Sequence, residues 1–350
     1  MKGEFSMKRK FIATLVLILA GLLSLCLRVF REPQEYTRHS QAMNTIIRMT
    51  IYGHDNTALD DAFTLLNETD RRLSMYDPSS DISLVNKNAG LVPVSPSPET
   101  VEAVNEAIRL YEITGGVFNP LIGPVTRLWK INREDGLNKI PSAESLDSAV
   151  KLADIRNISV SGDKIFLREK GCVIDLGGMA KGFASAKIAD MLRDKGIKSA
   201  ILDLGGNVHT VGTKPDGSKW RVGIRNPLKP AGTPALVVDV EDSAVITSGN
   251  YERYKTIDGK KYSHFFDPLT GQSVNSDLLS VPVISENGSL ADGLATAFMI
   301  TGVEKALGIL RNMANPPGVI FITQEGITAT ENLREVITQS LIPVTFREVR

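Results

Sequence analysis

The stretch VIDLGGMAKGFASAKIADML, residues 173–192, indicates most about the fold of this chain. It predicts a strand ending at Asp175, a two-glycine turn and a helix that opens near Lys181. Glycines let a ligand approach the backbone closely, and a helix N-terminus attracts phosphate. Lys181 adds a positive charge. The alternative is a plain strand–turn–helix connection, because the stretch matches neither standard nucleotide-binding pattern.

A second stretch, AILDLGGNVHTVG at residues 200–212, repeats the strand that ends in Asp-Leu-Gly-Gly. Two such turns in one chain suggest two backbone walls of a single cleft. His209 follows on the next predicted strand. A lone strand histidine is more often structural than catalytic, so it is not assigned to the site.

Around these stretches, helices and strands are interleaved along the chain. A first strand is expected at 41–53, and Ser97 and Gly115 mark the start and the stop of one helix. Hairpin signals argue against a purely parallel sheet, so we expect an α+β fold, a mixed α/β single domain over residues 36–350. Further helices are expected at 58–76, 183–196 and 290–312, and further strands at 164–168, 172–176, 199–204 and 235–240.

The composition excludes several classes of protein. The 350 residues include 40 basic and 40 acidic side chains, and 42% are hydrophobic, which is typical of a globular chain. No long basic run follows the N-terminal region, which argues against nucleic-acid binding. Of the two cysteines, Cys26 lies in an apolar run, so Cys172 can form neither an internal disulfide nor a cysteine-based metal site in the body.

The N-terminus predicts export. Three basic residues at 8–10 precede an apolar run at 11–27. That run is nearly as long as the roughly 20 residues that span a bilayer. No small-x-small cleavage site follows it, which favours an uncleaved signal anchor in residues 1–35. The alternatives are a lipid-modified Cys26, although Leu25 is larger than the residue usual before such a cysteine, and a buried helix of the body.

The helix expected at 290–312 carries Asp292 and Thr296 one turn apart on the same face. A carboxylate and a hydroxyl so placed suit an oxygen-preferring cation such as Mg²⁺. The alternative is a capping box from Ser289 to Asp292, with the acid favoured by the helix dipole.

His264 lies beside a hairpin whose turn is Asp258-Gly259. Strand alternation puts His264 on one face with Tyr262 and Phe266. That aromatic face fits either a core or a pocket that stacks a flat ring.

In their order along the chain, these stretches resemble the ApbE family of flavin transferases, from about Met43 to Gly302. Each motif is short, but seven or more in order are highly specific. The motifs are MNT (43–45), LSMYDPSSDISLVN (73–86), GGVFNPLIGP (115–124), IDLGGMAKG (174–182), LGGN (204–207), WRVGIRNP (220–227), SGNYERY (248–254), SHFFDPLTG (263–271) and ADGLATA (291–297).

The resemblance implies a mixed α/β fold with a central FAD cleft. It implies an FAD:protein FMN transferase that cuts the FAD pyrophosphate with Mg²⁺, joins FMN to a Thr or Ser of a partner protein and releases AMP. The implied acceptors are subunits of exported or membrane-bound respiratory flavoproteins. The implied location is the bacterial inner membrane, with the body on the periplasmic side. The alternatives are an FAD pyrophosphatase, a non-catalytic periplasmic FAD-binding protein and a thiamine-synthesis lipoprotein.

The resemblance also implies site residues by position. His264 matches the family's H-x-x-D-P-x-T-G histidine, as a base toward the acceptor hydroxyl or as a phosphate clamp, and Asp292 is the other candidate base. The implied flavin or adenine contacts are Met43, Tyr76, Phe118, Asn119 and Pro120; the FAD contacts are Asp175 and Lys181; the Mg²⁺ ligands are the Gly178 carbonyl, Asp292 and Thr296.

Two positions depart from the family pattern. Members commonly have F-D-P where this chain has Asn119 between Phe118 and Pro120, and M-G-T where it has Asn44. We expect these changes to alter how the flavin is held, or the balance between transfer and hydrolysis.

Overall fold

A computed structural model describes residues 33–131, 139–230 and 232–349, together with Thr14, residues 16–19 and Gly21. The predicted anchor at 11–27 therefore lies mostly outside the described residues. Within those ranges, no helix is both long enough and apolar enough to cross a membrane.

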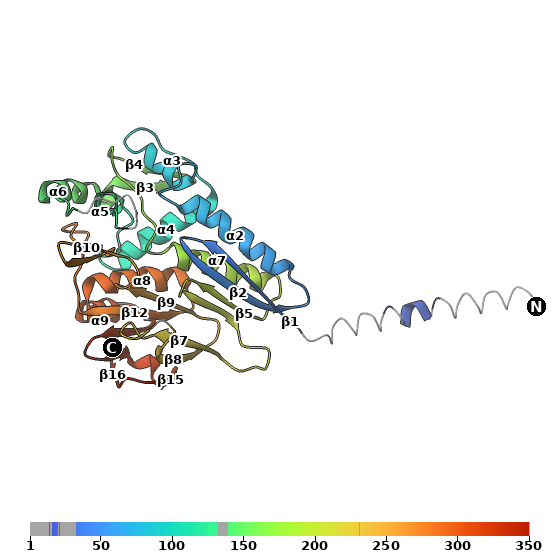
Figure 1. The fold of residues 1–350 in the computed structure, drawn as a ribbon. Helices are drawn as coiled ribbons and strands as arrows, with labels where there is room; N and C mark the ends of the chain where they lie inside the picture. The colour runs from blue at the N-terminus through green and yellow to red at the C-terminus, as the bar shows by residue number, and fades with distance from the viewer. Residues whose placement is uncertain are drawn as a thin grey trace, which may run out of the picture.

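A nine-stranded sheet forms the centre of the body (Figure 1). Its neighbouring strands pair antiparallel, apart from the parallel pair β14 and β16. The expectation of a mixed fold without a purely parallel sheet is therefore confirmed. In spatial order the strands are β1 (Gln34–Ala42), β2 (Thr45–Gly53), β5 (Ser199–Leu204), β6 (Val208–Gly212), β9 (Ala244–Gly249), β12 (Leu278–Ser285), β13 (Gly318–Thr323), β14 (Ile327–Thr330) and β16 (Val344–Arg347).

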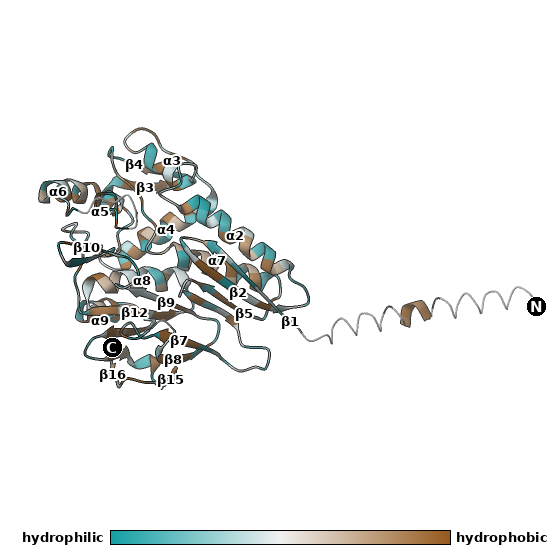
Figure 2. Ribbon diagram, in the orientation of Figure 1, coloured by the Kyte–Doolittle hydropathy of each residue, from teal (hydrophilic) through white to brown (hydrophobic). Residues whose placement is uncertain are grey.

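Helices and a small sheet cover this sheet. The helices α2 (Thr57–Leu73), α7 (Ala180–Asp194) and α8 (Gly288–Thr301) pack against its strands and against one another. The three-stranded sheet β15-β8-β7 shares a separate core with the central strands. Figure 2 shows apolar residues concentrated on the central strands. The bounds of the small sheet are β7 (Trp220–Arg225), β8 (Pro234–Val240) and β15 (Ile337–Ser340).

A further group of elements extends the body beyond α8, where α4 packs against that helix. The remaining elements are α3 (Asp81–Lys87), α4 (Pro98–Ile113), α5 (Gly123–Trp129), α6 (Ala143–Leu152), η1 (Ile155–Asn157), β3 (Ile158–Ser161), β4 (Lys164–Leu167), β10 (Tyr254–Ile257), β11 (Lys260–Ser263), α9 (Val303–Arg311) and η2 (Glu331–Leu333).

The segment predicted as one strand at 41–53 is instead a tight hairpin. β1 ends at Ala42, β2 starts at Thr45, and Met43 and Asn44 form the turn with φ values of 51° and 58°. A two-residue turn of this kind requires positive φ at both positions. The correction matters because the turn lies at the cavity described below.

The strand predicted at 172–176 is also wrong, because these residues are in neither a strand nor a helix. The Asn86 side chain replaces a strand partner, because it accepts from the Ile174 N–H at 2.7 Å and donates to the Ile174 carbonyl at 3.0 Å. The Pro120 carbonyl accepts from the Asp175 N–H at 2.8 Å. Side-chain and loop groups therefore position Asp175.

The helix predictions hold with one break. Ser97 caps α4 by accepting from the Thr100 N–H, as expected. The helix predicted at 290–312 is divided into α8 and α9 at Gly302, whose φ of 76° is outside the helical range.

Candidate active site

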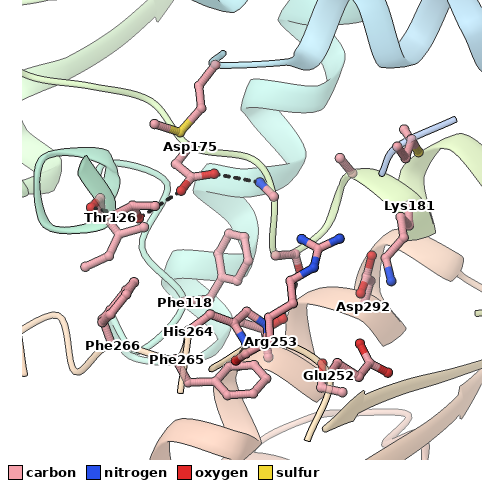
Figure 3. A pocket seen from close by; sticks show the side chains of 18 of the residues that line it. Phe118, Thr126, Asp175, Lys181, Glu252, Arg253, His264, Phe265, Phe266 and Asp292 are labelled. Atoms are coloured by element: carbon pink, nitrogen blue, oxygen red, sulfur yellow. Dashed lines mark hydrogen bonds between the residues drawn. The ribbon is translucent and has the colours of Figure 1, made fainter. Parts of the chain in front are cut away.

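One cavity collects most of the predicted site residues (Figure 3). It lies between the β1–β2 turn, the start of α7, the loop after β9, the residues after β11 and one face of α8. Among the described residues, Pro120 is the only predicted contact that does not line it. The predicted residues that do are Met43, Tyr76, Phe118, Asn119, Asp175, Gly178, Lys181, His264, Asp292 and Thr296.

The β1–β2 turn forms one wall. Its Met43 N–H donates to the Asp70 carboxylate at 2.8 Å, which holds the turn to α2. Asn is among the few residues that tolerate a left-handed conformation, so Asn44 can replace the glycine usual in the family. Met43 is strained at its φ of 51°, and such strain is concentrated at functional sites.

Asp175 and Lys181 lie on either side of the two-glycine turn that leads into α7. The Asp175 carboxylate accepts from the Gly177 N–H and from the Thr126 hydroxyl, both at 2.9 Å. Burial raises the pKa of Asp175, and these two hydrogen bonds oppose the rise. Lys181 sits in the first turn of α7, where its charge adds to the positive potential of the helix N-terminus.

Asp292 points into the cavity from α8, beside Lys181 (Figure 3). Its Oδ2 accepts from the Gly182 N–H at 2.8 Å. Burial raises the pKa of Asp292, whereas the positive charge of Lys181 and the Gly182 hydrogen bond lower it. The Asn207 amide also favours the charged form, although it lies outside hydrogen-bond geometry with any described group.

The capping alternative for Asp292 is wrong. Asn287 is the N-cap of α8, and its side chain accepts from the Leu290 N–H at 2.9 Å. Asp292 instead lies beyond the cap and bonds to a different helix. Its carboxylate is therefore held for the cavity and not for its own helix end.

The three predicted Mg²⁺ ligands are close together. Thr296, one turn after Asp292, donates to the Gly178 carbonyl at 2.9 Å. A carboxylate, a hydroxyl and a backbone carbonyl are oxygen donors that suit a hard cation. Across the described ranges, no three His, Cys, Asp or Glu side chains are grouped to hold a metal, but this donor set has only one such side chain.

His264 presents one nitrogen to the cavity. Its Nδ1 lies 3.0 Å from the Arg253 carbonyl, which can only accept, so Nδ1 carries the proton and Nε2 has a free lone pair. Burial lowers the pKa of His264 to about 4, and the charges of Arg253 and Lys181 lower it as well. The imidazole is therefore neutral at pH 7.

The predicted shared face of His264, Tyr262 and Phe266 is wrong. β11 ends at Ser263, so strand alternation does not continue through His264. Tyr262 and Phe266 pack against Trp129, with ring centroids 5.3 and 5.9 Å away. The His264 ring lies 4.1 Å from that of Phe265 and lines the cavity.

Asn119 lines the cavity, but both polar atoms of its side chain make hydrogen bonds to the protein backbone. Its amide nitrogen donates to the Ala153 carbonyl at 2.7 Å, and its oxygen accepts from the Leu121 N–H at 2.8 Å. An aspartate could make only the second bond. The departure at this position therefore adds a bond that fixes the loop behind Phe118.

The second Asp-Leu-Gly-Gly turn is not the other wall of the cleft. Asp203 accepts from the Gly206 N–H at 2.8 Å, and the turn joins β5 to β6. A β-carbon on Gly205 would lie 2.0 Å from the Thr45 hydroxyl. The turn therefore packs behind the β1–β2 hairpin and supports that wall from outside.

Glu252 and Arg253 line the cavity but were not assigned from the sequence. They belong to the SGNYERY motif, which precedes β10. Tyr254 pairs with Ser263 across the β10–β11 hairpin, so the residues flanking the hairpin are neighbours. The hairpin register could have indicated that Arg253 lies next to His264.

Comparison with known proteins identifies the family. The model of the ApbE family matches residues 43–321. The chain belongs to the ApbE family. The resemblance inferred from the sequence is thus confirmed.

Curated relatives within the family are named FAD:protein FMN transferase. The one from Treponema pallidum is 34% identical and aligns over 92% of this chain and 93% of its own length. The one from Vibrio cholerae is 31% identical, over 75% of this chain and 78% of its own length.

Solved structures share the fold. The flavin transferase ApbE from Vibrio cholerae has a TM-score of 0.76 at 28% identity, covering 85% of this chain and 96% of that chain. The apo flavinyl transferase ApbE from Pseudomonas stutzeri has a TM-score of 0.78 at 26% identity, covering 89% and 99%.

Proposed function

We propose that this chain is an FAD:protein FMN transferase that binds FAD in the cavity and transfers FMN to a Thr or Ser hydroxyl of a partner protein. Membership of the ApbE family supports the activity. The observation that carries the assignment to this cavity is its combination of groups: the free Nε2 of His264, the basic start of α7 and an all-oxygen donor set.

The cavity has one region that suits the aromatic rings of FAD and another that suits its phosphates. Met43, Tyr76 and Phe118 offer apolar surfaces for the flavin or the adenine. Lys181 and the N-terminus of α7 offer positive potential for the pyrophosphate. Asp175 completes the wall between the two regions.

Mg²⁺ is the cofactor that fits the oxygen donors. The Gly178 carbonyl, Asp292 and Thr296 would hold it. When bound there, the ion would neutralise phosphate charge and polarise the P–O bond.

The proposed transfer is a single displacement at the phosphorus of the FMN half of FAD. The acceptor hydroxyl oxygen bonds to the phosphorus of the FMN half, the bond from that phosphorus to the bridging oxygen breaks, and AMP leaves with the bridging oxygen. The hydroxyl proton passes to Nε2 of His264. Most of the remaining catalysis is positioning and charge stabilisation.

His264 suits the role of base better than that of phosphate clamp. A clamp must donate to phosphate oxygens, but Nδ1 is bonded to the Arg253 carbonyl and Nε2 of the neutral ring has only a lone pair. Asp292 is the weaker candidate for the base. Its Oδ2 already accepts from the Gly182 N–H, and its carboxylate is one of the proposed cation ligands.

The acceptor and the location form part of the proposal. We expect the acceptor to be an exported or membrane-bound respiratory flavoprotein subunit, with the body held on the periplasmic side by residues 11–27. The apolar run after a basic segment supports this placement. The full chain should enter the membrane fraction, and added protease should digest its body in spheroplasts; a soluble cytoplasmic chain would contradict it.

One assay tests the activity. The purified full chain is incubated with FAD, Mg²⁺ and an exported respiratory flavoprotein subunit, and the products are separated by mass spectrometry. Flavin joined to the acceptor is the expected result. Free FMN and AMP with an unmodified acceptor would indicate a pyrophosphatase, and unchanged FAD would indicate a binding protein.

A further inference from the structure

A line of hydrogen bonds runs from His209 on β6 to Asp292 in the cavity. His209 Nδ1 lies 3.1 Å from the Ser185 hydroxyl, which donates to the Gly182 carbonyl at 2.9 Å. The N–H of the same glycine donates to Asp292 Oδ2 at 2.8 Å. His209 and Ser185 are both buried, so this line lies inside the protein and away from the substrate.

The direction of these bonds is fixed by their donors. The single hydroxyl proton of Ser185 points to the Gly182 carbonyl, which can only accept, so His209 Nδ1 must donate to Ser185. His209 Nε2 then has a lone pair, and it has no hydrogen-bond partner among the described residues. This requires a neutral ring, and burial indeed lowers the pKa of His209 to about 4.

The line passes through the closest approach of α7 and α8. A β-carbon on Gly182 would lie 2.2 Å from the Gly288 carbonyl oxygen and 2.6 Å from the Asp292 β-carbon. A β-carbon on Gly288 would lie 3.3 Å from His209 Nδ1. Only glycines fit here, and glycine has the least restrained backbone. Close packing holds Gly182 within α7, and the bonds to Ser185 and Asp292 add to that restraint.

We propose that His209 is a positioning residue for Asp292: through Ser185 and Gly182 it fixes the carboxylate so that Oδ1 stays available to the cation. This role rests on the proposed function, because it needs a cation in the cavity. His209 itself does not line the cavity. Loss of groups that orient metal ligands typically costs 10–100-fold in metal affinity.

The test uses Mn²⁺ as probe and electron paramagnetic resonance of the purified full chain without FAD. In His209→Asn the side-chain N–H lies near the position of Nδ1, whereas in His209→Gln it lies near that of Nε2. We expect His209→Asn to bind Mn²⁺ within about threefold of the wild type. His209→Gln and Ser185→Ala should each bind roughly tenfold more weakly or worse. The double variant His209→Gln/Ser185→Ala should bind Mn²⁺ no more weakly than the weaker of the two single variants, because each change breaks the same line of hydrogen bonds.

Two controls separate this proposal from the proposed function. The first control is Asp292→Asn, which removes the only carboxylate of the proposed cation site. The second is thermal unfolding, which measures the stability lost when either His209 variant leaves a void. If the wild type and Asp292→Asn bind Mn²⁺ alike, the cation site itself is wrong and the positioning role falls with it. If Asp292→Asn loses Mn²⁺ while His209→Gln binds like the wild type, only the positioning role is overturned. Equal weakening in His209→Asn and His209→Gln would also overturn it, because packing alone would then explain the loss.

Discussion

The two Asp-Leu-Gly-Gly turns have the same sequence and different positions relative to the cavity. Residues 175–178 precede α7, and Asp175, Gly177 and Gly178 line the cavity. Residues 203–206 join β5 to β6, and Gly205 packs against Thr45 behind the cavity wall. One turn faces the ligand space, and the other supports it.

The difference comes from the element that follows each turn. A helix N-terminus carries positive potential, and at α7 one N–H of the first turn, that of Gly182, donates to the Asp292 carboxylate in the cavity. A strand uses its N–H groups in the sheet ladder; Ser199–Asp203 pairs with Val208–Gly212. In this chain, the copy of these four residues that lines the cavity is the one that a helix follows.

The largest expected effect is at His264, which lies across the cavity from the first turn. His264→Ala should lower FMN transfer by at least about 100-fold, because it removes the proposed general base. The FAD affinity and the unfolding temperature should change little. Initial rates with a fixed acceptor measure the effect, and His54→Ala, at an exposed histidine, is the matched control. Unchanged turnover in His264→Ala would remove this residue from the mechanism.

The turns themselves can be compared by one glycine in each. In Gly178→Ala the new β-carbon would lie 3.1 Å from the Thr296 methyl and 3.2 Å from the Phe118 ring. We expect roughly 10-fold less activity, because the proposed cation donors shift, with little loss of stability. In Gly205→Ala the β-carbon would meet Thr45 at 2.0 Å in a residue with φ of 69°. This should cost about 1–3 kcal/mol of unfolding free energy.

Activity per folded molecule and chemical denaturation distinguish the two variants. Gly205→Ala should keep most of its activity at a temperature where it is folded. The comparison of the turns fails if Gly178→Ala mainly unfolds the protein, or if Gly205→Ala abolishes transfer in a fully folded sample.

The last expected effect is the pH dependence of stability. His209, after the second turn, and His264, across from the first, both have a pKa lowered from 6.5 to about 4 by burial. The unfolded chain therefore binds protons first as the pH falls. The stability linked to the neutral rings is present above pH 6.5 and is lost progressively between pH 6.5 and 4.

Unfolding temperatures across this pH range test the point. His209→Asn and His264→Asn should each flatten the acid side of the curve, whereas His54→Ala should leave it unchanged. An equally steep loss in both Asn variants would show that other groups cause the acid sensitivity.

Much of the fold could be predicted because its signals are local. Ser97 begins a helix with its own side chain, and Asp258-Gly259 forms a hairpin turn through its own φ values. The wrong predictions are those where residues far apart in the sequence determine the local structure. Asn86 substitutes for a strand partner of Ile174 across 88 residues of sequence. The turn at Met43 lacks a glycine, so no local signal separated β1 from β2.

The sequence brought together residues that line one cavity, but it did not show the contacts that those residues make. The family motifs led to residues that line one cavity, because the motifs follow the cavity walls. They did not show that the Asn119 side chain bonds inward or that Arg253 orients His264. Those facts depend on backbone groups brought together by folding, which one sequence does not show.

The ratio of AMP released to FMN bound to the acceptor tests the central claim most directly. Both products are counted in one reaction of the full chain with FAD, Mg²⁺ and an exported flavoprotein subunit. The displacement at phosphorus predicts one AMP for each acceptor-bound FMN, with no free FMN. AMP released together with free FMN and an unmodified acceptor would contradict the account.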